Sequence, residues 1–175
     1  MNISGKKVLL RAIEEQDNEM LNEMVNDSQI EKCIGGWSFP VSSYAQHEWF
    51  KKQCNSTNSL RCIVETKAEK QAIGMISLTG IDYKNGCASL NIKLSSKSRG
   101  QGHGSDALFA MCEYAFSELR LNCLASEILE HNIPSQKLFL KVGFKKEGTL
   151  RQRVYKQGKY LDVFTLSILK DEFYG

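Results

Sequence analysis

The clearest pattern along the chain is a helical repeat of apolar residues near its middle. Apolar side chains recur every three or four residues and predict an amphipathic helix over 102–119; they are Leu108, Met111, Cys112, Ala115, Phe116 and Leu119. The segment 87–94 before it alternates apolar and polar residues, as a half-buried strand does, and the segment 124–129 after it is also strand-like. Together the three segments predict one βαβ unit with parallel strands.

Shorter strand patterns lie on both sides of this unit. Segments 60–65 and 72–78 are joined to each other and to 87–94 by short loops, so these strands pair antiparallel, because a parallel crossover needs about a dozen residues. The remaining predicted strands are 8–13, 144–154 and 160–169, and the remaining predicted helices follow residue 17 or cover 44–54 and 135–142. The pattern predicts a single domain over residues 1–175 of mixed α/β (α+β) class, with a mostly antiparallel sheet of about six or seven strands, one parallel pair and about four helices.

Composition agrees with one globular domain and excludes several classes of protein. With 175 residues, 42% of them hydrophobic, the chain can form one core without a metal or a disulfide. Its net charge of +3 is too small to indicate a nucleic-acid-binding protein, and no apolar run is long enough to predict a membrane protein. The six cysteines show no zinc-type spacing, so we expect no metal site, buried free thiols and a reducing, cytoplasmic location.

Charged residues are distributed unevenly along the chain. Eight Lys or Arg residues and one acid, Glu147, lie between Lys137 and Lys159, whereas residues 14–31 contain seven acids and no Lys or Arg. Such runs are often only solvated faces. The alternative is that the basic run favours a phosphorylated ligand and the acidic run attracts a cationic one.

The loop before the long helix is rich in glycine and positive charge, and reads Lys97-Ser98-Arg99-Gly100-Gln101-Gly102-His103-Gly104-Ser105. Alternate glycines let a ligand approach the backbone, and the N–H groups at a helix N-terminus favour an anion such as phosphate. A P-loop is excluded because Ser105 and not Lys follows Gly104, and a dinucleotide-binding pattern on Gly102, Gly104 and Ala107 conflicts with the antiparallel strands before it. The loop predicts phosphate binding, and a glycine turn without a ligand is the alternative.

Residues 99–104 also fit the pattern Arg/Gln-x-x-Gly-x-Gly/Ala, and here the sequence resembles the GNAT superfamily of acyl-CoA-dependent N-acetyltransferases. A second segment, 132–144, resembles the family's Asn-x-x-Ala/Ser-x-x-Leu-Tyr-x-Lys-x-Gly-Phe pattern. The segment 146–173 is similar to the branch that includes ribosomal-protein N-terminal acetyltransferases and spermidine acetyltransferases. The resemblance covers nearly the whole chain and is weakest over 28–60.

The resemblance implies a GNAT-like fold and acetyl-CoA as cosubstrate. In that family the strands that correspond to 87–94 and 124–129 splay apart, pantetheine enters between them and bonds to main-chain groups, and the glycine loop holds the pyrophosphate. By this likeness we expect the coenzyme to contact Ile92, Lys93, Leu94, Arg99, Gly100, Gln101, Gly102, His103, Gly104, Ser105, Asn132, Ser135, Phe139 and Lys141. The side chains of Ile92 and Leu94 fit equally well in the core.

The expected reaction is attack of a primary amine on the acetyl thioester in a ternary complex. At pH 7 only about one in a thousand alkylamine molecules is uncharged, so deprotonation of the amine costs about 4 kcal/mol and requires a base or a water relay. The sequence has Phe139 where the family often has a Tyr proton donor, and Ser89 where it often has a Glu. We therefore expect Ser135 to steady the thiolate and Glu130 or His131 to relay the amine proton. The alternatives are that Ser135 caps a helix, that His131 is an ordinary loop residue and that His103 only shapes the phosphate loop.

The sequence leaves the identity of the acceptor amine open. A polyamine, an aminosugar, a nucleotide-linked aminosugar or a protein N-terminus each fit, and the acids between Glu14 and Glu31 favour a cationic one. Aromatic residues that could line its pocket, or simply pack, are Trp37, Tyr155 and Tyr160. Two other functions remain open: a coenzyme A-binding module without catalysis and, further from the pattern, a nucleotide-dependent oxidoreductase. Members of the branch often form homodimers, and no residue marks a contact surface.

Overall fold

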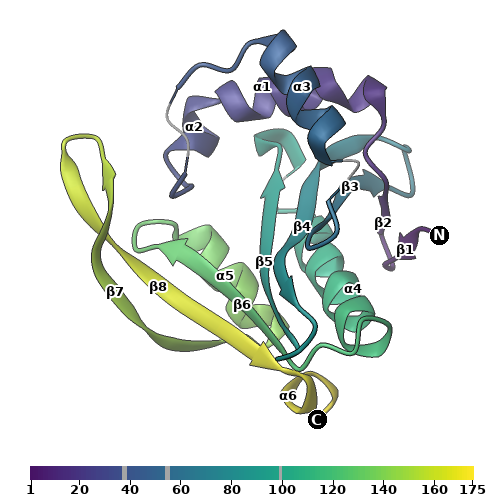
Figure 1. The fold of residues 1–175 in the computed structure, drawn as a ribbon, viewed down its shortest axis with the longest axis vertical. Helices are drawn as coiled ribbons and strands as arrows, with labels where there is room; N and C mark the ends of the chain where they lie inside the picture. The colour runs from purple at the N-terminus through teal and green to yellow at the C-terminus, as the bar shows by residue number, and fades with distance from the viewer. Residues whose placement is uncertain (37–38, 54–55, 99) are drawn as a thin grey trace.

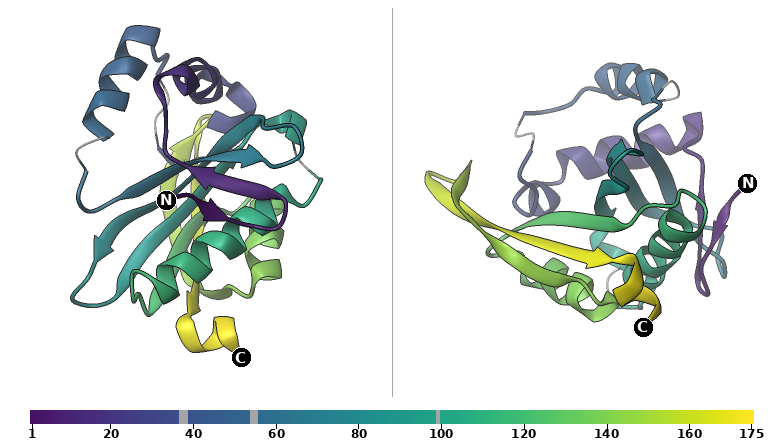
Figure 2. Two further views of the ribbon diagram at one scale, coloured as in Figure 1. Left: turned by 90° about the vertical axis from the view of Figure 1, so that its right-hand side faces the viewer. Right: turned by 60° about the horizontal axis from the view of Figure 1, so that its bottom comes forward.

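The chain forms one twisted sheet with helices on both faces (Figures 1 and 2). The computed structural model describes residues 1–36, 39–53, 56–98 and 100–175. Neighbouring strands pair antiparallel except β5 and β6, which are parallel, and the spatial order is β1-β2-β3-β4-β5-β6-β8-β7. The strands are β1 (Ile3–Ser4), β2 (Val8–Arg11), β3 (Leu60–Thr66), β4 (Ala72–Asp82), β5 (Cys87–Leu94), β6 (Cys123–Leu129), β7 (Lys145–Lys156) and β8 (Lys159–Leu169).

Helices α4 and α5 cover one face of the sheet, and α1 to α3 lie over the other (Figures 1 and 2). The helices are α1 (Asn18–Asn26), α2 (Ser28–Glu31), α3 (Ser43–Gln53), α4 (His103–Ser117), α5 (Ile133–Val142) and α6 (Lys170–Tyr174), with 3-10 turns η1 (Glu15–Asp17) and η2 (Ser96–Ser98). The β7–β8 hairpin extends beyond the helices as a long arm (Figure 1). This arrangement leaves the ends of β5 and β6 between the two helical layers.

The predicted mixed fold, with its single parallel pair, is confirmed. The described sheet has one strand more than the upper estimate because the two-residue β1 pairs with β2. The first predicted strand ends at Arg11 and not at residue 13. The helix expected over 135–142 begins at Ile133, since the Asn132 side chain accepts a hydrogen bond from Ser135 N and so caps it two residues earlier.

The core lies between the sheet and helix α4. In β5, Ala88 and Leu90 are buried while Ser89 and Asn91 are exposed, which confirms the predicted alternation. The apolar stripe predicted for the long helix is buried at every position but one: Leu108, Met111, Cys112, Ala115 and Phe116 are buried, and Leu119 is half-buried. Periodicity therefore identified which face of β5 and which face of α4 enter the core.

The expectation of buried thiols is only partly correct. Cys62 and Cys112 are buried, and desolvation raises the pKa of Cys62 to about 11 and that of Cys112 to about 12. Cys87 is exposed, so the prediction is wrong for this residue, and Cys33 and Cys123 are half-buried. Cys87 opens β5 directly after a turn, where a strand-like sequence does not guarantee cover from a helix. Cys54 lies outside the described residues.

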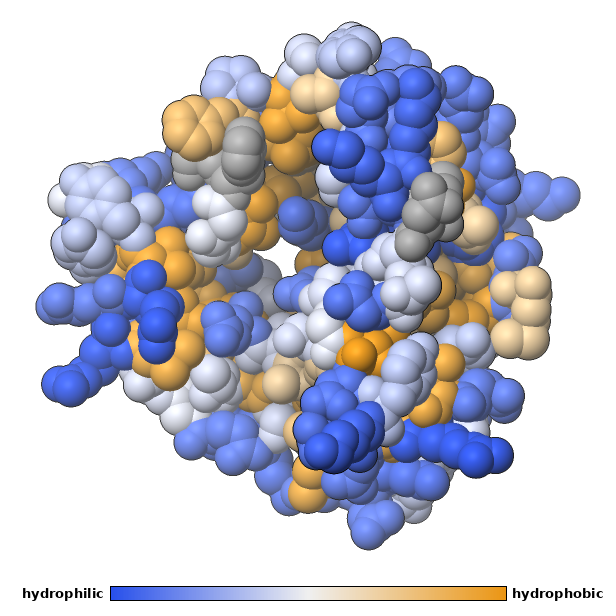
Figure 3. All heavy atoms as spheres, in the orientation of Figure 1, coloured by the Kyte–Doolittle hydropathy of each residue, from blue (hydrophilic) through white to orange (hydrophobic). Residues whose placement is uncertain are grey.

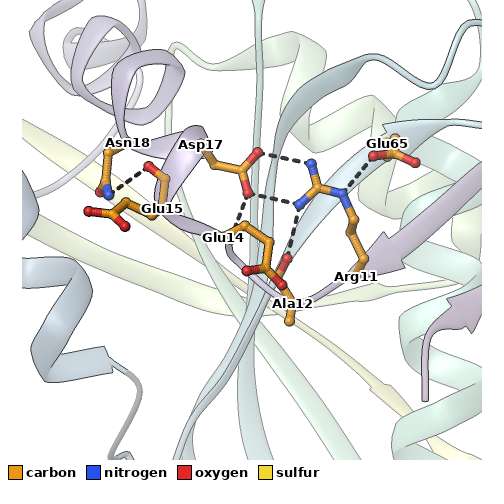
Figure 4. Close-up of polar contacts among 7 residues, drawn as sticks. All are labelled: Arg11, Ala12, Glu14, Glu15, Asp17, Asn18 and Glu65. Atoms are coloured by element: carbon orange, nitrogen blue, oxygen red, sulfur yellow. Dashed lines mark hydrogen bonds and ion pairs between the residues drawn. The ribbon is translucent and has the colours of Figure 1, made fainter.

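A buried ion pair holds the first helical turn against the sheet (Figure 4). Arg11, the last residue of β2, donates from Nη1 and Nη2 to the two carboxylate oxygens of Asp17 at 2.8 and 2.9 Å. Its Nε donates to Glu65 Oε2 on β3 at 2.6 Å, and the Asp17 carboxylate also accepts the Glu14 N–H. The hydrogen bond to Asp17 is the largest influence that raises the pKa of Arg11. The network fixes where α1 starts relative to the strands.

Candidate functional site

Strands β5 and β6 separate after three residue pairs. They pair at Cys87 with Cys123, at Ala88 with Leu124 and at Ser89 with Ala125, after which β5 continues against β4 alone and β6 against β8 alone. The divergence that the resemblance implies is therefore confirmed. The space-filling view is hollowed in the corresponding place, between the upper helices and the ends of the two strands (Figure 3). Main-chain groups of Ile92 and Leu94 border this opening on the side of β5.

The glycine loop leads from the end of β5 into helix α4. Gly102 caps the helix with φ of 83°, in the left-handed region where glycine has no steric penalty. Gly104 is buried, and a Cβ there would lie 3.2 Å from the side chain of Leu138 on α5 and 3.3 Å from that of Leu94. The N–H groups of His103, Gly104 and Ser105 lie in the first helical turn, before the first hydrogen bond of the helix, which Asp106 N donates to Gly102 O. Such N–H groups have no partner within the helix and favour an anion. Arg99 lies outside the described residues.

Two features of this loop carry further information about a ligand. Nδ1 of His103 is buried and has no hydrogen-bond partner in the described part of the chain. The Asp106 carboxylate, in the first turn of α4, accepts three N–H groups from the turn between β1 and β2 and the first residue of β2. Nothing local in the sequence indicates that contact, because it joins segments about a hundred residues apart.

The three candidate catalytic residues lie at the end of β6 and the start of α5. Glu130 Oε1 accepts the Asp162 N–H at 3.2 Å, and His131 Nε2 hydrogen-bonds Lys32 O at 2.8 Å. Ser135 is half-buried in the first turn of α5. The alternative that Ser135 caps this helix is wrong, because Asn132 is the cap. Their catalytic roles stay predictions, and two of the three side chains already have structural partners.

Asn132 connects the β6–α5 junction to the segment after α2. Its Oδ1 caps α5, and its Nδ2 donates to Cys33 O at 3.2 Å. With the contact between His131 and Lys32, this places the segment 31–33 beside the open end of β6. The family resemblance is weakest over 28–60, and this segment of that range lies next to the predicted site.

The residue at the family's usual tyrosine position is part of the core. Phe139 is 1% exposed, and its ring packs edge to face on Phe144 with ring centroids 4.9 Å apart. Ser89 is exposed on β5, opposite Thr79 of β4 and Ala125 of β6. Lys141 is exposed on α5. The contact of Phe139 and Lys141 with a coenzyme therefore stays a prediction.

A second cation accompanies Lys93 on the face of the sheet opposite α4. Lys93 shares this face with Asn91, and Asn91 lies in register with Ser77, which pairs with Arg61. Burial and the positive charge of Arg61 lower the pKa of Lys93, and burial lowers the pKa of Arg61 as well. The strand alternation predicted the face on which Lys93 lies. Arg61 was missed because it belongs to a strand distant in sequence.

Several acids of the acidic run have structural partners, and one ion pair joins this run to the basic run. Glu31 pairs with Lys156, Asp17 with Arg11, and Asp27 caps α2 by accepting the Gln29 N–H at 2.7 Å. Glu19 and Glu23 of α1 are exposed. Much of the acidic run therefore has a structural role that sequence counting did not reveal.

The aromatic candidates lie on the extended hairpin, except for Trp37, which falls outside the described residues. Tyr155 and Tyr160 form a cross-strand pair with centroids 5.0 Å apart, and both are exposed. Among the described residues no group of His, Cys, Asp and Glu has the arrangement of a metal site. No helix in the described ranges is long and apolar enough to cross a membrane.

Comparison with known proteins agrees with this geometry. The chain is 27% identical over 170 residues to the SPβ prophage-derived uncharacterized N-acetyltransferase YokL of Bacillus subtilis (strain 168), covering 97% of this chain and 94% of the relative. It is 25% identical to a spermidine N(1)-acetyltransferase of Vibrio cholerae, covering 97% and 96%.

A solved structure of spermidine N-acetyltransferase from Vibrio cholerae in complex with CoA and spermine has the same fold, with a TM-score of 0.90, 24% identity and coverage of 97% and 99%. The sequence profile of the acetyltransferase (GNAT) domain matches residues 7–145, most of the chain. The chain therefore belongs to the GNAT family of acetyltransferases and is an N-acetyltransferase.

Proposed function

We propose that this protein transfers the acetyl group of acetyl-CoA to a primary amine of a small polyamine, by direct attack in a ternary complex. The observation that carries the proposal is the divergence of β5 from β6, which opens directly onto the glycine loop and the N-terminus of α4. A thioester arm fits an opening bordered by stretches of β5 and β6 that no longer pair with each other, and a pyrophosphate fits the helix N-terminus. Nδ1 of His103, which is buried and has no hydrogen-bond partner among the described residues, is a further group that a phosphate or its hydration shell can satisfy.

In this proposal the backbone of Ile92 to Leu94 binds pantetheine, and an N–H near Leu94 stabilises the oxyanion. The Ser135 hydroxyl steadies the departing thiolate, because Phe139 has no proton to give. Glu130 or His131 passes the amine proton to water, with the Glu130 carboxylate held in place by the Asp162 N–H. Acetyl-CoA supplies the activated acyl group, and the protein supplies orientation, hydrogen bonds and a route for the proton.

The choice of a polyamine as acceptor is supported by two observations. Several relatives bear the name spermidine N(1)-acetyltransferase. The exposed carboxylates Glu19 and Glu23 of α1 provide negative charge on the helical layer above the opening. A protein N-terminus is the second candidate, because another relative, 28% identical over 179 residues, is a putative ribosomal N-acetyltransferase of Bacillus subtilis.

The experiment mixes the protein with acetyl-CoA and separate acceptors and measures thiol release. We expect turnover with spermidine or spermine to exceed that with aminosugars, nucleotide-linked aminosugars and short peptides. Peptide-selective turnover would replace the polyamine with a protein N-terminus. Tight binding of acetyl-CoA without turnover on any acceptor would indicate a binding module, and no binding of acetyl-CoA would overturn the proposal.

The location of the pyrophosphate is tested by Gly102→Asp. The substitution places a carboxylate at the helix N-terminus, so the Kd for CoA is expected to rise at least about tenfold. Gly158→Asp is the matched control, because Gly158 has φ of 81°, close to the 83° of Gly102, and open space around it in the β7–β8 turn. Equal CoA affinity in both variants would exclude the loop as the pyrophosphate site.

A further inference from the structure

The turn between β1 and β2 is bound to the first turn of helix α4. Three successive backbone N–H groups, those of Lys6, Lys7 and Val8, donate to the Asp106 carboxylate at 2.9, 2.6 and 3.0 Å. The turn itself is closed by Gly5 N donating to Val8 O at 2.9 Å. One carboxylate thus accepts three successive backbone N–H groups and joins the N-terminal hairpin to the glycine loop region.

The rest of the turn is equally constrained. A Cβ at Gly5 would lie 2.5 Å from Asp106 Oδ2, so this close approach requires glycine. On the other side, Lys67 N donates to Lys7 O at 2.9 Å, and Lys67 Nζ donates to Ser4 Oγ at 2.7 Å. The backbone of Lys7 is therefore held from both sides, which limits where its side chain can go.

The side chain of Lys7 reaches the glycine loop. Its Nζ donates to Gln101 O at 3.0 Å and lies 3.4 Å from the position that a Cβ on Gly102 would occupy. Gly102 is the cap of α4, so the ammonium group sits beside the positive end of the helix. An ammonium has three donors, and the described contacts use one of them. No ion pair involves Lys7 within the part of the chain that the structure describes.

The same contacts resolve an electrostatic conflict. Asp106 is an acid in the first helical turn, near the N–H groups expected to hold a phosphate, and a free carboxylate there would repel that anion. Three N–H donors take up its oxygens, and Lys7 adds a full positive charge on the side of the loop. The Asp106 carboxylate thereby places the Lys7 ammonium group beside the expected phosphate site, which an unpartnered carboxylate would weaken by repulsion.

We propose that the N-terminal turn is part of the coenzyme site: Lys7 is a ligand of the coenzyme phosphates, and Asp106 is the positioning residue that holds the turn against the glycine loop. The inference rests on the proposed function, since it takes coenzyme A as the ligand of this loop. It adds a binding residue from the N-terminal end of the chain, distant in sequence from the glycine loop and from the segment 132–144.

The experiment compares Lys7→Met with Lys6→Met. Both residues are exposed and adjacent, and both backbones bond to Asp106. Among the contacts of the described residues, only the Lys7 side chain reaches the loop. Loss of a charge-assisted contact is expected to raise the Kd for CoA about tenfold in Lys7→Met. The Kd of Lys6→Met should change less than about twofold, and Lys7→Arg should recover most of the affinity.

A second substrate separates phosphate binding from general damage to the site. S-acetylpantetheine carries the thioester but no phosphate, so kcat/KM for it should be equal in wild type and Lys7→Met, while kcat/KM for acetyl-CoA falls about tenfold. Asp106→Asn should raise the Kd for CoA and also lower the Tm, because it loosens the turn.

Three results would overturn the inference: unchanged CoA affinity in Lys7→Met, an equal loss in Lys6→Met, or an equal fall of kcat/KM on both thioesters. Failure of the wild type to bind CoA is a different result, because it removes the proposed function itself.

Discussion

Asp17→Asn tests whether the ion pair in Figure 4 holds the first helix in place. The substitution keeps the size of the side chain and removes its charge. Asp17 is 4% exposed and Arg11 15%, so solvent cannot replace the lost partner. Breaking one side of a buried pair typically costs about 3–5 kcal/mol. Arg11 keeps its bond to Glu65, which places the expected loss of unfolding free energy near the lower limit, at about 3 kcal/mol.

The measurement is urea denaturation, together with a thermal scan. For a chain of this length about 3 kcal/mol corresponds to a fall in Tm of about 6–12 °C. Glu15→Gln is the matched control two residues away. The Glu15 side chain is 79% exposed and its Oε1 lies 3.9 Å from Nε2 of His47, so loss of the Glu15 charge should change the unfolding free energy by less than about 0.5 kcal/mol. A loss below about 1 kcal/mol in Asp17→Asn, or an equal loss in Glu15→Gln, would refute the reasoning.

Three further predictions follow from burial and charge. Lys93→Met should be at least as stable as wild type at pH 7, because burial and Arg61 lower the pKa of Lys93. Between the lowered pKa of folded Lys93 and the unfolded value near 10.4, the unfolded chain holds more protons than the folded one, so the stability of the wild type relative to this variant should rise with pH. Denaturation at several pH values measures this, and a difference in unfolding free energy that does not change with pH would contradict the idea. Iodoacetamide should label exposed Cys87 in the native protein while Cys62 and Cys112 react only after unfolding, as peptide mass mapping can check; native labelling of Cys112 would contradict the packing. Glu19→Gln with Glu23→Gln should raise KM for spermidine several-fold and leave KM for acetyl-CoA unchanged in steady-state assays, and an unchanged spermidine KM would remove the electrostatic role of α1.

Local sequence patterns predicted most of the fold and the region of the candidate site. The apolar repeat located the long helix, and the alternation in 87–94 identified the buried face of strand β5. The glycine pattern located the loop between this strand and the helix. These features depend on residues within a few turns or strand positions of one another. The helix start at Ile133 was missed because the capping residue Asn132 lay just outside the predicted range.

The sequence by itself therefore determined most of the elements and the single parallel pair, since periodicity acts over short distances, whereas the phosphate chemistry of the glycine loop stays a prediction. Only the tertiary structure decided where β5 and β6 part, after Ser89 and Ala125, because strand separation depends on the neighbours β4 and β8. It also brought Lys7 to Gln101 and Asp106 to the N-terminal turn. Contacts between segments about a hundred residues apart leave no local pattern, because folding of the whole sheet creates them.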